Sequence, residues 1–167
     1  MRRLWAPWRM EYIKKPRERD CLFCRVAKED SDRDNLILYR SQHSYIIMNR
    51  YPYNNGHVMV VPYRHVASPE MLDVEEDVDI SDLIKISIKV IRRVMNPQGF
   101  NIGANIGKAA GAGIEEHYHI HIVPRWVGDT NFMPIISDTK VVVEHILDTY
   151  NRLKEELDKY LENEDNL

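Results

Sequence analysis

Short apolar runs separated by turn residues make up most of the chain as far as Arg125. Their length and their enrichment in valine, isoleucine and tyrosine indicate β-strands rather than helices. The turn sequence Pro52–Gly56 and the residue Pro124 mark two of the strand boundaries. We predict five strands, at residues 36–39, 44–48, 57–62, 100–106 and 117–123. The first two are expected to form a hairpin.

Two longer segments carry apolar residues at intervals of three and four, the spacing that places side chains on one face of a helix. The first helix is predicted to begin near Asp79 or Ser81, after an acid-rich loop at residues 67–78, and to end at Asn96–Gly99. The second is predicted over residues 138–161, followed by a polar, frayed tail. The apolar stripes are Ile80, Leu83, Ile84, Ile88, Ile91, Val94 and Met95 in the first helix, and Val142, His145 or Ile146, Leu153 and Leu157 in the second.

A run of strands with one helix inserted and one appended predicts an α+β fold, in which helices pack on one face of an antiparallel sheet. The length of 167 residues suits a single domain, and no repeat or linker divides the sequence. We expect an N-terminal arm at residues 1–20, a folded domain at residues 21–136, and a C-terminal helix and tail at residues 137–167.

Composition excludes several functional classes. Apolar residues make up 44% and charged residues 29% of the chain, the ordinary mixture of a globular protein. The formal net charge of -3 provides no field that would attract nucleic acid. Apolar runs such as Val58–Val61 are too short to span a membrane, and the start Met1–Trp8 lacks the apolar core of a signal peptide. We therefore expect a cytoplasmic protein whose partners are neither nucleic acid nor membrane.

The two cysteines of the chain, Cys21 and Cys24, are spaced C-x-x-C. They are too few for a disulfide scaffold. The spacing is compatible with half of a metal site, with a redox pair and with two unrelated free thiols. The redox interpretation requires a β-α-β context, and the sequence around the pair provides no clear one. All three interpretations fit a reducing compartment.

The segment 117–123 concentrates histidines with period two. His117, His119 and His121 are predicted to share one face of a strand, about 6.6 Å apart at about 3.3 Å per residue, while Tyr118 and Ile120 point into a core. Imidazoles so arranged can act as nucleophiles, proton donors and phosphate contacts near neutral pH. Two alternatives are a solvated sheet face and a histidine-only metal site with a catalytic water. Such a metal site usually includes a carboxylate a few residues after the histidines, and the first one to follow them here is Asp129.

The pattern of alternating histidines and apolar residues resembles the signature of the histidine triad nucleotide-binding family. The segment Gly56–His65 resembles the family's second block, and Asn105–Gly107 with the following Gly-rich loop resembles the segment before the triad. The aromatic N-terminus, the motif Cys21–Cys24 and the long C-terminal helix resemble the subgroup of diadenosine tetraphosphate phosphorylases and related hydrolases. This resemblance implies the HIT-like fold and a homodimer whose sheets join into one.

The resemblance also implies a mechanism. The central histidine, His119, would attack the α-phosphorus of a dinucleoside polyphosphate to form a nucleotidyl-histidine. Water or inorganic phosphate would then release the nucleotide. His121 would contact the phosphoryl oxygens or the leaving group, and His57 would support the triad. A structural alternative for His57 is a strand residue that caps a turn.

The resemblance further implies a set of nucleotide contacts and requires no organic cofactor. Asn49 would bind the ribose hydroxyls, and Phe23 and Ile47 would sandwich the base, although core packing explains these two apolar residues equally well. The loop before the triad would offer amide groups to phosphate; the alternative is an ordinary flexible loop. The predicted contacts in and near this loop are Asn105, Gly107, Gly111 and Gly113.

Some family members hold a structural zinc with ligands that correspond to Cys21, Cys24, His65 and His117. Two thiolates and two imidazoles would form a closed tetrahedral site without a catalytic water.

The sequence also departs from the family pattern. A Ser or Thr that contacts phosphate in many smaller members is missing from Ala112–Glu116, which leaves the handling of the leaving group open. Glu115 and Glu116 would repel a polyphosphate, hold a metal ion or simply be solvated. Three further basic residues would reach outer phosphates or serve as surface charges: Lys108, Arg125 and Lys140.

Three functions remain compatible with the sequence. The first is a hydrolase or phosphorylase that acts on dinucleoside polyphosphates. The second is a nucleotide-binding sensor with little turnover, and the third is a zinc-bearing interaction module whose triad is incidental. Product formation from diadenosine tetraphosphate distinguishes the first from the other two.

Overall fold

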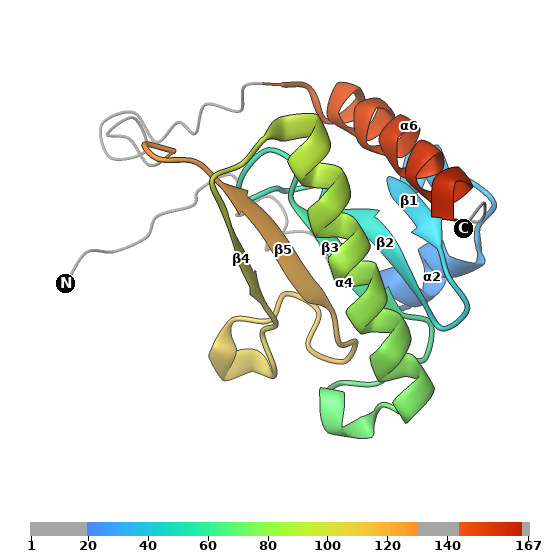
Figure 1. Ribbon diagram of the computed structural model, residues 1–167. Helices are drawn as coiled ribbons and strands as arrows, with labels where there is room; N and C mark the ends of the chain where they lie inside the picture. Colours follow the sequence, from blue (N-terminus) through green and yellow to red (C-terminus); the bar gives the residue numbers. More distant parts are fainter. Residues whose placement is uncertain (1–19, 130–143, 165–167) are drawn as a thin grey trace.

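Five antiparallel strands form one open sheet at the centre of the fold (Figure 1). The computed structural model of the protein describes residues 20–129 and 144–164. The strands lie in the spatial order β1-β2-β3-β5-β4 and comprise β1 (Ile37–Arg40), β2 (Ser44–Met48), β3 (Val58–Pro62), β4 (Gly99–Gly103) and β5 (Ile120–Arg125). The first three strands match their predicted ranges to within one residue. The predicted α+β class is confirmed.

One row of residues runs straight across the sheet and defines the face on which the site lies. Antiparallel pairing connects Ile37 with Ile47, Ile47 with Met59, Met59 with His121, and His121 with Gly103. Because side chains directly opposite one another point to the same side, Ile47, Met59 and His121 share a face.

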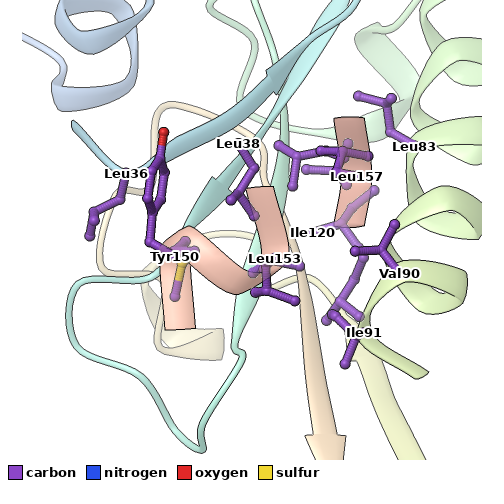
Figure 2. Close-up of a cluster of buried hydrophobic side chains, with 14 of the residues drawn as sticks. Leu36, Leu38, Leu83, Val90, Ile91, Ile120, Tyr150, Leu153 and Leu157 are labelled. Carbon is purple, nitrogen blue, oxygen red and sulfur yellow. The ribbon is translucent and has the colours of Figure 1, made fainter. Parts of the chain in front are cut away.

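Two long helices cover the opposite face of the sheet. Helix α4 (Val74–Met95) packs on β2 and β3, and α6 (Ile146–Glu164) packs beside it on β1 (Figure 1). The Tyr150 hydroxyl donates to the carbonyl of Ile37 at 3.0 Å. Figure 2 shows the main core, to which both helices and the strands contribute Leu36, Leu38, Leu83, Val90, Ile91, Ile120, Tyr150, Leu153 and Leu157. The predicted packing of helices on one face is therefore confirmed for these two helices.

A short helix that the sequence did not predict, α2 (Leu22–Lys28), lies on the other face and precedes α3 (Asp32–Asn35). Phe23 and Val26 of α2 are buried, and the Tyr45 hydroxyl donates to the Phe23 carbonyl at 3.0 Å. The first residue of β1 and alternate residues along β2 and β3 supply the apolar side chains beneath α2. These are Ile37, Tyr45, Ile47, Met59 and Val61.

The predicted loop at residues 67–78 is wrong over its second half, because α4 begins at Val74. A short 3₁₀ turn, η2 (Pro69–Met71), precedes it. Asp73 and Glu76 form a reciprocal capping box, in which the Glu76 carboxylate accepts from the Asp73 N–H at 2.9 Å. The acidic residues of the predicted loop therefore occupy the first turn of a helix, where the helix dipole stabilises negative charge.

Strand β5 differs from its prediction at both ends. It begins at Ile120 rather than His117, because the Tyr118 N–H donates to the carbonyl of Val66, outside the strand ladder, at 2.6 Å. The strand also continues through Pro124. Pairing with β3 ends at Ile122, so the N–H that proline lacks would have had no partner on the β3 side of the strand. Strand β4 is shorter than predicted and ends at Gly103.

Helix α6 begins at Ile146, whereas the prediction placed its start near residue 138. Glu144 and His145 are not helical, and the His145 ring accepts the Leu147 N–H at 3.3 Å, which caps the first turn. The helix continues to Glu164, into the segment predicted to be a frayed tail. The predicted arm at residues 1–20, apart from Asp20, and residues 137–143 of the predicted C-terminal segment lie outside the described residues. None of the helices in the described ranges is long and apolar enough to cross a membrane.

Candidate active site

The histidine rings lie side by side on the sheet face that α2 covers. The His119 and His121 ring centroids are 4.9 Å apart, and those of His57 and His121 are 5.1 Å apart. The Phe23 ring lies 4.9 Å from His119 and 5.4 Å from His117. The alternate residues Ile120 and Ile122 belong to the core on the other face. The period-two pattern thus separates histidines from core residues, although His117 and His119 precede the strand proper.

The ring of His119 is held in one tautomer by the backbone. Its Nδ1 lies 2.8 Å from the carbonyl oxygen of His117, which can only accept, so Nδ1 carries the proton and Nε2 keeps its lone pair. The side chain is 5% exposed. Burial lowers its pKa and is opposed by the bond to the His117 carbonyl, so the ring is neutral near pH 7. A neutral ring with an unprotonated Nε2 is the form required of a nucleophile.

A second chain of hydrogen bonds orients His57 and His121. The Tyr53 N–H donates to Nδ1 of His57 at 3.0 Å, which requires the neutral His57 ring to carry its proton on Nε2. That Nε2 lies 2.9 Å from Nδ1 of His121, so His121 accepts there and carries its own proton on Nε2. His57 is fully buried. These hydrogen bonds therefore make His121 a hydrogen-bond donor at its Nε2.

His117 is held in the opposite tautomer to His119. Its Nε2 donates to the Pro62 carbonyl at 2.8 Å, which leaves the Nδ1 lone pair directed at two thiols. Nδ1 lies 3.3 Å from the Cys21 sulfur and 3.5 Å from the Cys24 sulfur. Burial lowers the pKa of His117 to about 4, so the ring is neutral, as a metal ligand must be.

His65 completes a cluster of four potential metal ligands. Its Nδ1 lies 3.3 Å from the Cys24 sulfur, and the donor atoms of Cys21, Cys24, His65 and His117 all lie within 4.8 Å of one another. A tetrahedral zinc with Zn–S and Zn–N bonds of about 2.3 and 2.0 Å would separate sulfur from nitrogen by about 3.5 Å. The observed separations fit that geometry. Burial, and then the neighbouring Cys21 sulfur, raises the pKa of the Cys24 thiol, a penalty that a divalent cation would remove.

The predicted base and ribose contacts lie on the histidine face. Phe23 and Ile47 are buried in the apolar cluster under α2, which provides the packing role that the sequence also allowed. Asn49 is half-buried, accepts the Tyr51 N–H at 2.9 Å, and directs its amide nitrogen to the Met59 sulfur at 3.5 Å. Because Met59 pairs with His121, this amide group lies near the triad.

The Gly-rich loop adopts the conformations that its glycines permit. Gly107 and Gly111 have φ values of 74° and 84° and flank the 3₁₀ turn η3 (Lys108–Ala110). Ile114, at the end of the loop, packs against the cluster under α2, which anchors the loop to the histidine face. Of the remaining predicted loop residues, Asn105 is half-buried and Gly113 is exposed.

Arg125, for which the sequence allows either a contact to outer phosphates or a surface charge, is bound to other protein groups. It forms a two-pronged ion pair with Asp129 at 2.6 and 2.7 Å and donates to the Asn101 side chain at 2.8 Å. This arrangement favours a structural role over contact with outer phosphates. Lys108 and Glu116 are exposed, Glu115 is half-buried, and Lys140 lies outside the described residues.

Tyr53 is the main site residue that sequence reasoning missed. Its N–H fixes the His57 ring, and its aromatic ring stacks on His57 at 5.0 Å with an interplanar angle of 16°. The sequence shows a turn at Pro52–Gly56, but the direction of one backbone N–H in that turn depends on the three-dimensional fold. Its position four residues before His57 is the only sequence signal.

Comparison with known proteins identifies the family. The HIT domain model matches residues 30–127. The chain is 40% identical over 164 residues to a protein of Mycobacterium tuberculosis named AP-4-A phosphorylase, covering 93% of this chain and 84% of that protein. Among solved structures, a zinc-bound histidine triad protein from Mycobacterium smegmatis is 21% identical with a TM-score of 0.69, covering 86% of this chain and 97% of that one. A hypothetical histidine triad nucleotide-binding protein from Sulfolobus tokodaii is 26% identical with a TM-score of 0.65, covering 86% and 93%. The chain therefore belongs to the histidine triad family, as its histidine pattern predicts, and is an enzyme of that family.

Proposed function

We propose that the protein cleaves dinucleoside polyphosphates such as diadenosine tetraphosphate at the α-phosphate, through a covalent nucleotide on His119. The name of the Mycobacterium tuberculosis relative, with 40% identity over nearly the whole chain, supports this substrate class. The observation that carries the mechanism is the tautomer of His119, whose Nδ1–H is bound to the His117 carbonyl and whose Nε2 is unprotonated.

In the first step, Nε2 of His119 forms a bond to the α-phosphorus, and the bond from that phosphorus to the bridging oxygen breaks. With diadenosine tetraphosphate, the leaving group is ATP and the enzyme retains an adenylyl group. The His117 carbonyl stabilises the positive charge that develops on the ring, because it accepts from the opposite nitrogen. In the second step, water or inorganic phosphate attacks the same phosphorus, and Nε2 leaves. Water gives AMP and phosphate gives ADP.

The hydrogen-bond chain through His57 defines the role of His121 in this proposal. With its proton on Nε2, His121 donates to the phosphoryl or bridging oxygen and stabilises the negative charge that develops there. His57 keeps that proton in place by donating to the other nitrogen. The fixed donor position avoids reorganisation during the reaction.

The nucleotide contacts are proposed on the same face. Asn49 binds the ribose, and Phe23 with Ile47 borders the base, since all three lie on or beside the row that contains His121. Amide groups of the preceding loop contact phosphate, where the positive φ values of its glycines allow close approach. The loop residues involved are Asn105, Gly107, Gly111 and Gly113.

We also propose that Cys21, Cys24, His65 and His117 hold a structural zinc. The separations of the four donor atoms support it, and the fold of a zinc-bound histidine triad protein is similar. A four-ligand site has no open position for water, so the metal would supply structural stability rather than chemistry. It would connect α2 to the bend after β3 and to the start of β5.

A homodimer with joined sheets is proposed from the β4 edge of the sheet, which pairs with no further strand among residues 20–129 and 144–164. Strand β4 lies at that edge, and Ile102 within it is 47% exposed. An exposed strand edge with an apolar side chain is suited to pairing with a second copy. We propose a cytoplasmic location because Cys21 and Cys24 are not joined in a disulfide, as expected in a reducing compartment.

The test is a product assay with diadenosine tetraphosphate, with and without inorganic phosphate. AMP plus ATP indicates hydrolysis, and phosphate-dependent ADP plus ATP indicates phosphorolysis; either outcome supports the proposal. Tight nucleotide binding without product at high enzyme concentration would instead support a sensor.

A further inference from the structure

The turn between β2 and β3 is anchored by Asn54 to a second turn that follows β5. The Asn54 side-chain amide donates to the Pro124 carbonyl at 3.1 Å and to the Asp129 carboxylate at 2.9 Å. The backbone carbonyl of Asn54 accepts the His57 N–H at 3.2 Å. One residue therefore connects the turn after β5 with the backbone segment that carries the proposed site.

The carboxylate of Asp129 is itself held in place from several directions. It is 10% exposed, pairs with two nitrogens of Arg125, and accepts the Trp126 N–H at 3.1 Å. Arg125 also donates to Asn101 on the edge strand β4. Because these contacts fix the carboxylate relative to the sheet, Asn54 has a rigid acceptor.

This anchoring matters because the turn carries the Tyr53 N–H. That N–H is what prevents Nδ1 of His57 from holding a proton. If the turn moved, Nδ1 of His57 could become protonated, Nε2 would become an acceptor, and His121 would donate from Nδ1. Nε2 of His121 would then present a lone pair, rather than a proton, to the substrate, so one displaced N–H would reverse the polarity of the histidine pair.

We propose that Asn54 and Asp129 are positioning residues, which hold the Tyr53 N–H against His57 and thereby keep a proton on Nε2 of His121. This assignment rests on the proposed function, in which that proton faces the reacting phosphate. Neither residue contacts the histidine rings through its side chain in the bonds described, so their effect passes through the backbone of the turn. By keeping this proton in place, Asn54 and Asp129 also favour a substrate group that accepts a hydrogen bond from His121, such as a phosphate oxygen, over a group that donates one.

The direct test is long-range ¹H–¹⁵N NMR of the histidine rings in the full-length protein, which distinguishes the two neutral tautomers without requiring turnover. The ring signals are assigned by replacing His57 and His121 in turn. In the wild type, both rings are expected in the Nε2–H form. In Asn54→Ala and in Asp129→Ala, both rings are expected to show a mixture of tautomers. A pure Nε2–H form in both variants would overturn the proposal.

Kinetics provide the second readout. Each variant is expected to lower kcat about 10- to 100-fold with a KM within about threefold of wild type, since a small misplacement of a group in contact with substrate reduces turnover to this extent. The double variant is expected to lose no more than the worse single variant, because both act along one path. Additive losses in the double variant would contradict that path.

A matched control separates positioning from general loss of a surface ion pair. Lys154 and Asp158 form an i,i+4 pair like Arg125 and Asp129 but lie on α6, so Asp158→Ala should leave the ring signals and kcat unchanged. If the wild type shows fixed tautomers that the variants disturb but makes no product, the proposed function fails and the positioning role stands. Normal turnover with undisturbed tautomers in the variants would refute the positioning role and leave the proposed function intact.

Discussion

His117 and His119 are separated by one residue, yet the fold presents a different ring nitrogen from each. His117 donates from Nε2 to the carbonyl of Pro62 and directs Nδ1 toward Cys21 and Cys24. His119 donates from Nδ1 to the carbonyl of His117 and keeps Nε2 unprotonated. Both rings are buried and both have lowered pKa values, with burial as the main cause.

The difference shows that burial makes these imidazoles neutral, whereas the neighbouring carbonyl decides what each can do. The same side chain becomes a proposed ligand at one position and a proposed nucleophile at the next. The backbone of His117 connects the two roles, since its ring belongs to the proposed zinc site and its carbonyl orients His119. Substitutions in either region therefore test whether the roles are separable.

The largest expected effect comes from His119→Asn, which removes the proposed attacking nitrogen. Turnover of diadenosine tetraphosphate should fall at least about 1,000-fold, because the neighbouring His121 carries its proton on Nε2 and cannot attack in place of His119. The nucleotide Kd, measured by calorimetry, should stay within about threefold of wild type. Equal losses of affinity and turnover would instead indicate a binding role for this ring.

A smaller loss is expected for His121→Ala, which removes the proposed hydrogen-bond donor but retains the nucleophile. We expect kcat to fall about 100-fold, the lower range for the loss of a positioned proton donor. Steady-state kinetics should compare this loss between diadenosine tetraphosphate and a substrate whose leaving group is a weaker base. A better leaving group should recover part of the loss, whereas an unchanged ratio between the two substrates would argue against a contact with the leaving group.

In the proposed zinc site, Cys21→Ser should reduce zinc from about one per chain to a small fraction, because a closed site needs all four ligands. We expect the thermal midpoint to fall by about 5–15 °C, at roughly 2–4 °C per kcal/mol for a chain of this size. Activity at low temperature should fall less than about tenfold, since His117 retains its bond to Pro62. Elemental analysis measures the zinc content and calorimetry the thermal midpoint, with Gln42→Ala, at an exposed position outside the site, as the control. Unchanged zinc content would refute the site.

The smallest expected effect on activity comes from the opposite face of the sheet. Leu153 is fully buried between the sheet and α4 (Figure 2), and Leu153→Ala should lower the free energy of unfolding by about 2–4 kcal/mol. The kcat of the folded fraction should be unchanged, because the sheet separates this core from the histidines. Urea unfolding and kinetics on the same sample test this, and a tenfold loss of kcat would mean that the two faces are coupled.

Sequence reasoning recovered the features that depend on local period and composition. Alternation predicted that Ile120 and Ile122 oppose the histidines, and the stripe from Ile80 to Ile91 predicted the buried side of α4. It also gave Cys21, Cys24, His65 and His117 as one cluster, although they come from separate segments; that grouping came from the family resemblance, because spacing alone cannot bring distant segments together.

The structural features that sequence reasoning missed depend on single contacts. The Asp73–Glu76 capping box moved the start of α4, and α2 is too short for its period to stand out. The orientation of each histidine ring depends on which carbonyl or N–H lies beside it, as with the Tyr53 N–H. Backbone donors and acceptors are the same at every residue, so the sequence does not reveal where they point.

The central claim is that the middle ring, His119, bonds to phosphorus, and the stereochemical course at the α-phosphorus tests it most directly. Each in-line displacement inverts the configuration, so two successive displacements through a nucleotidyl-enzyme restore it. With a substrate chiral at the α-phosphorus through sulfur substitution, we predict net retention in the released nucleotide. Net inversion would mean a single direct attack by water or phosphate and would contradict the covalent mechanism.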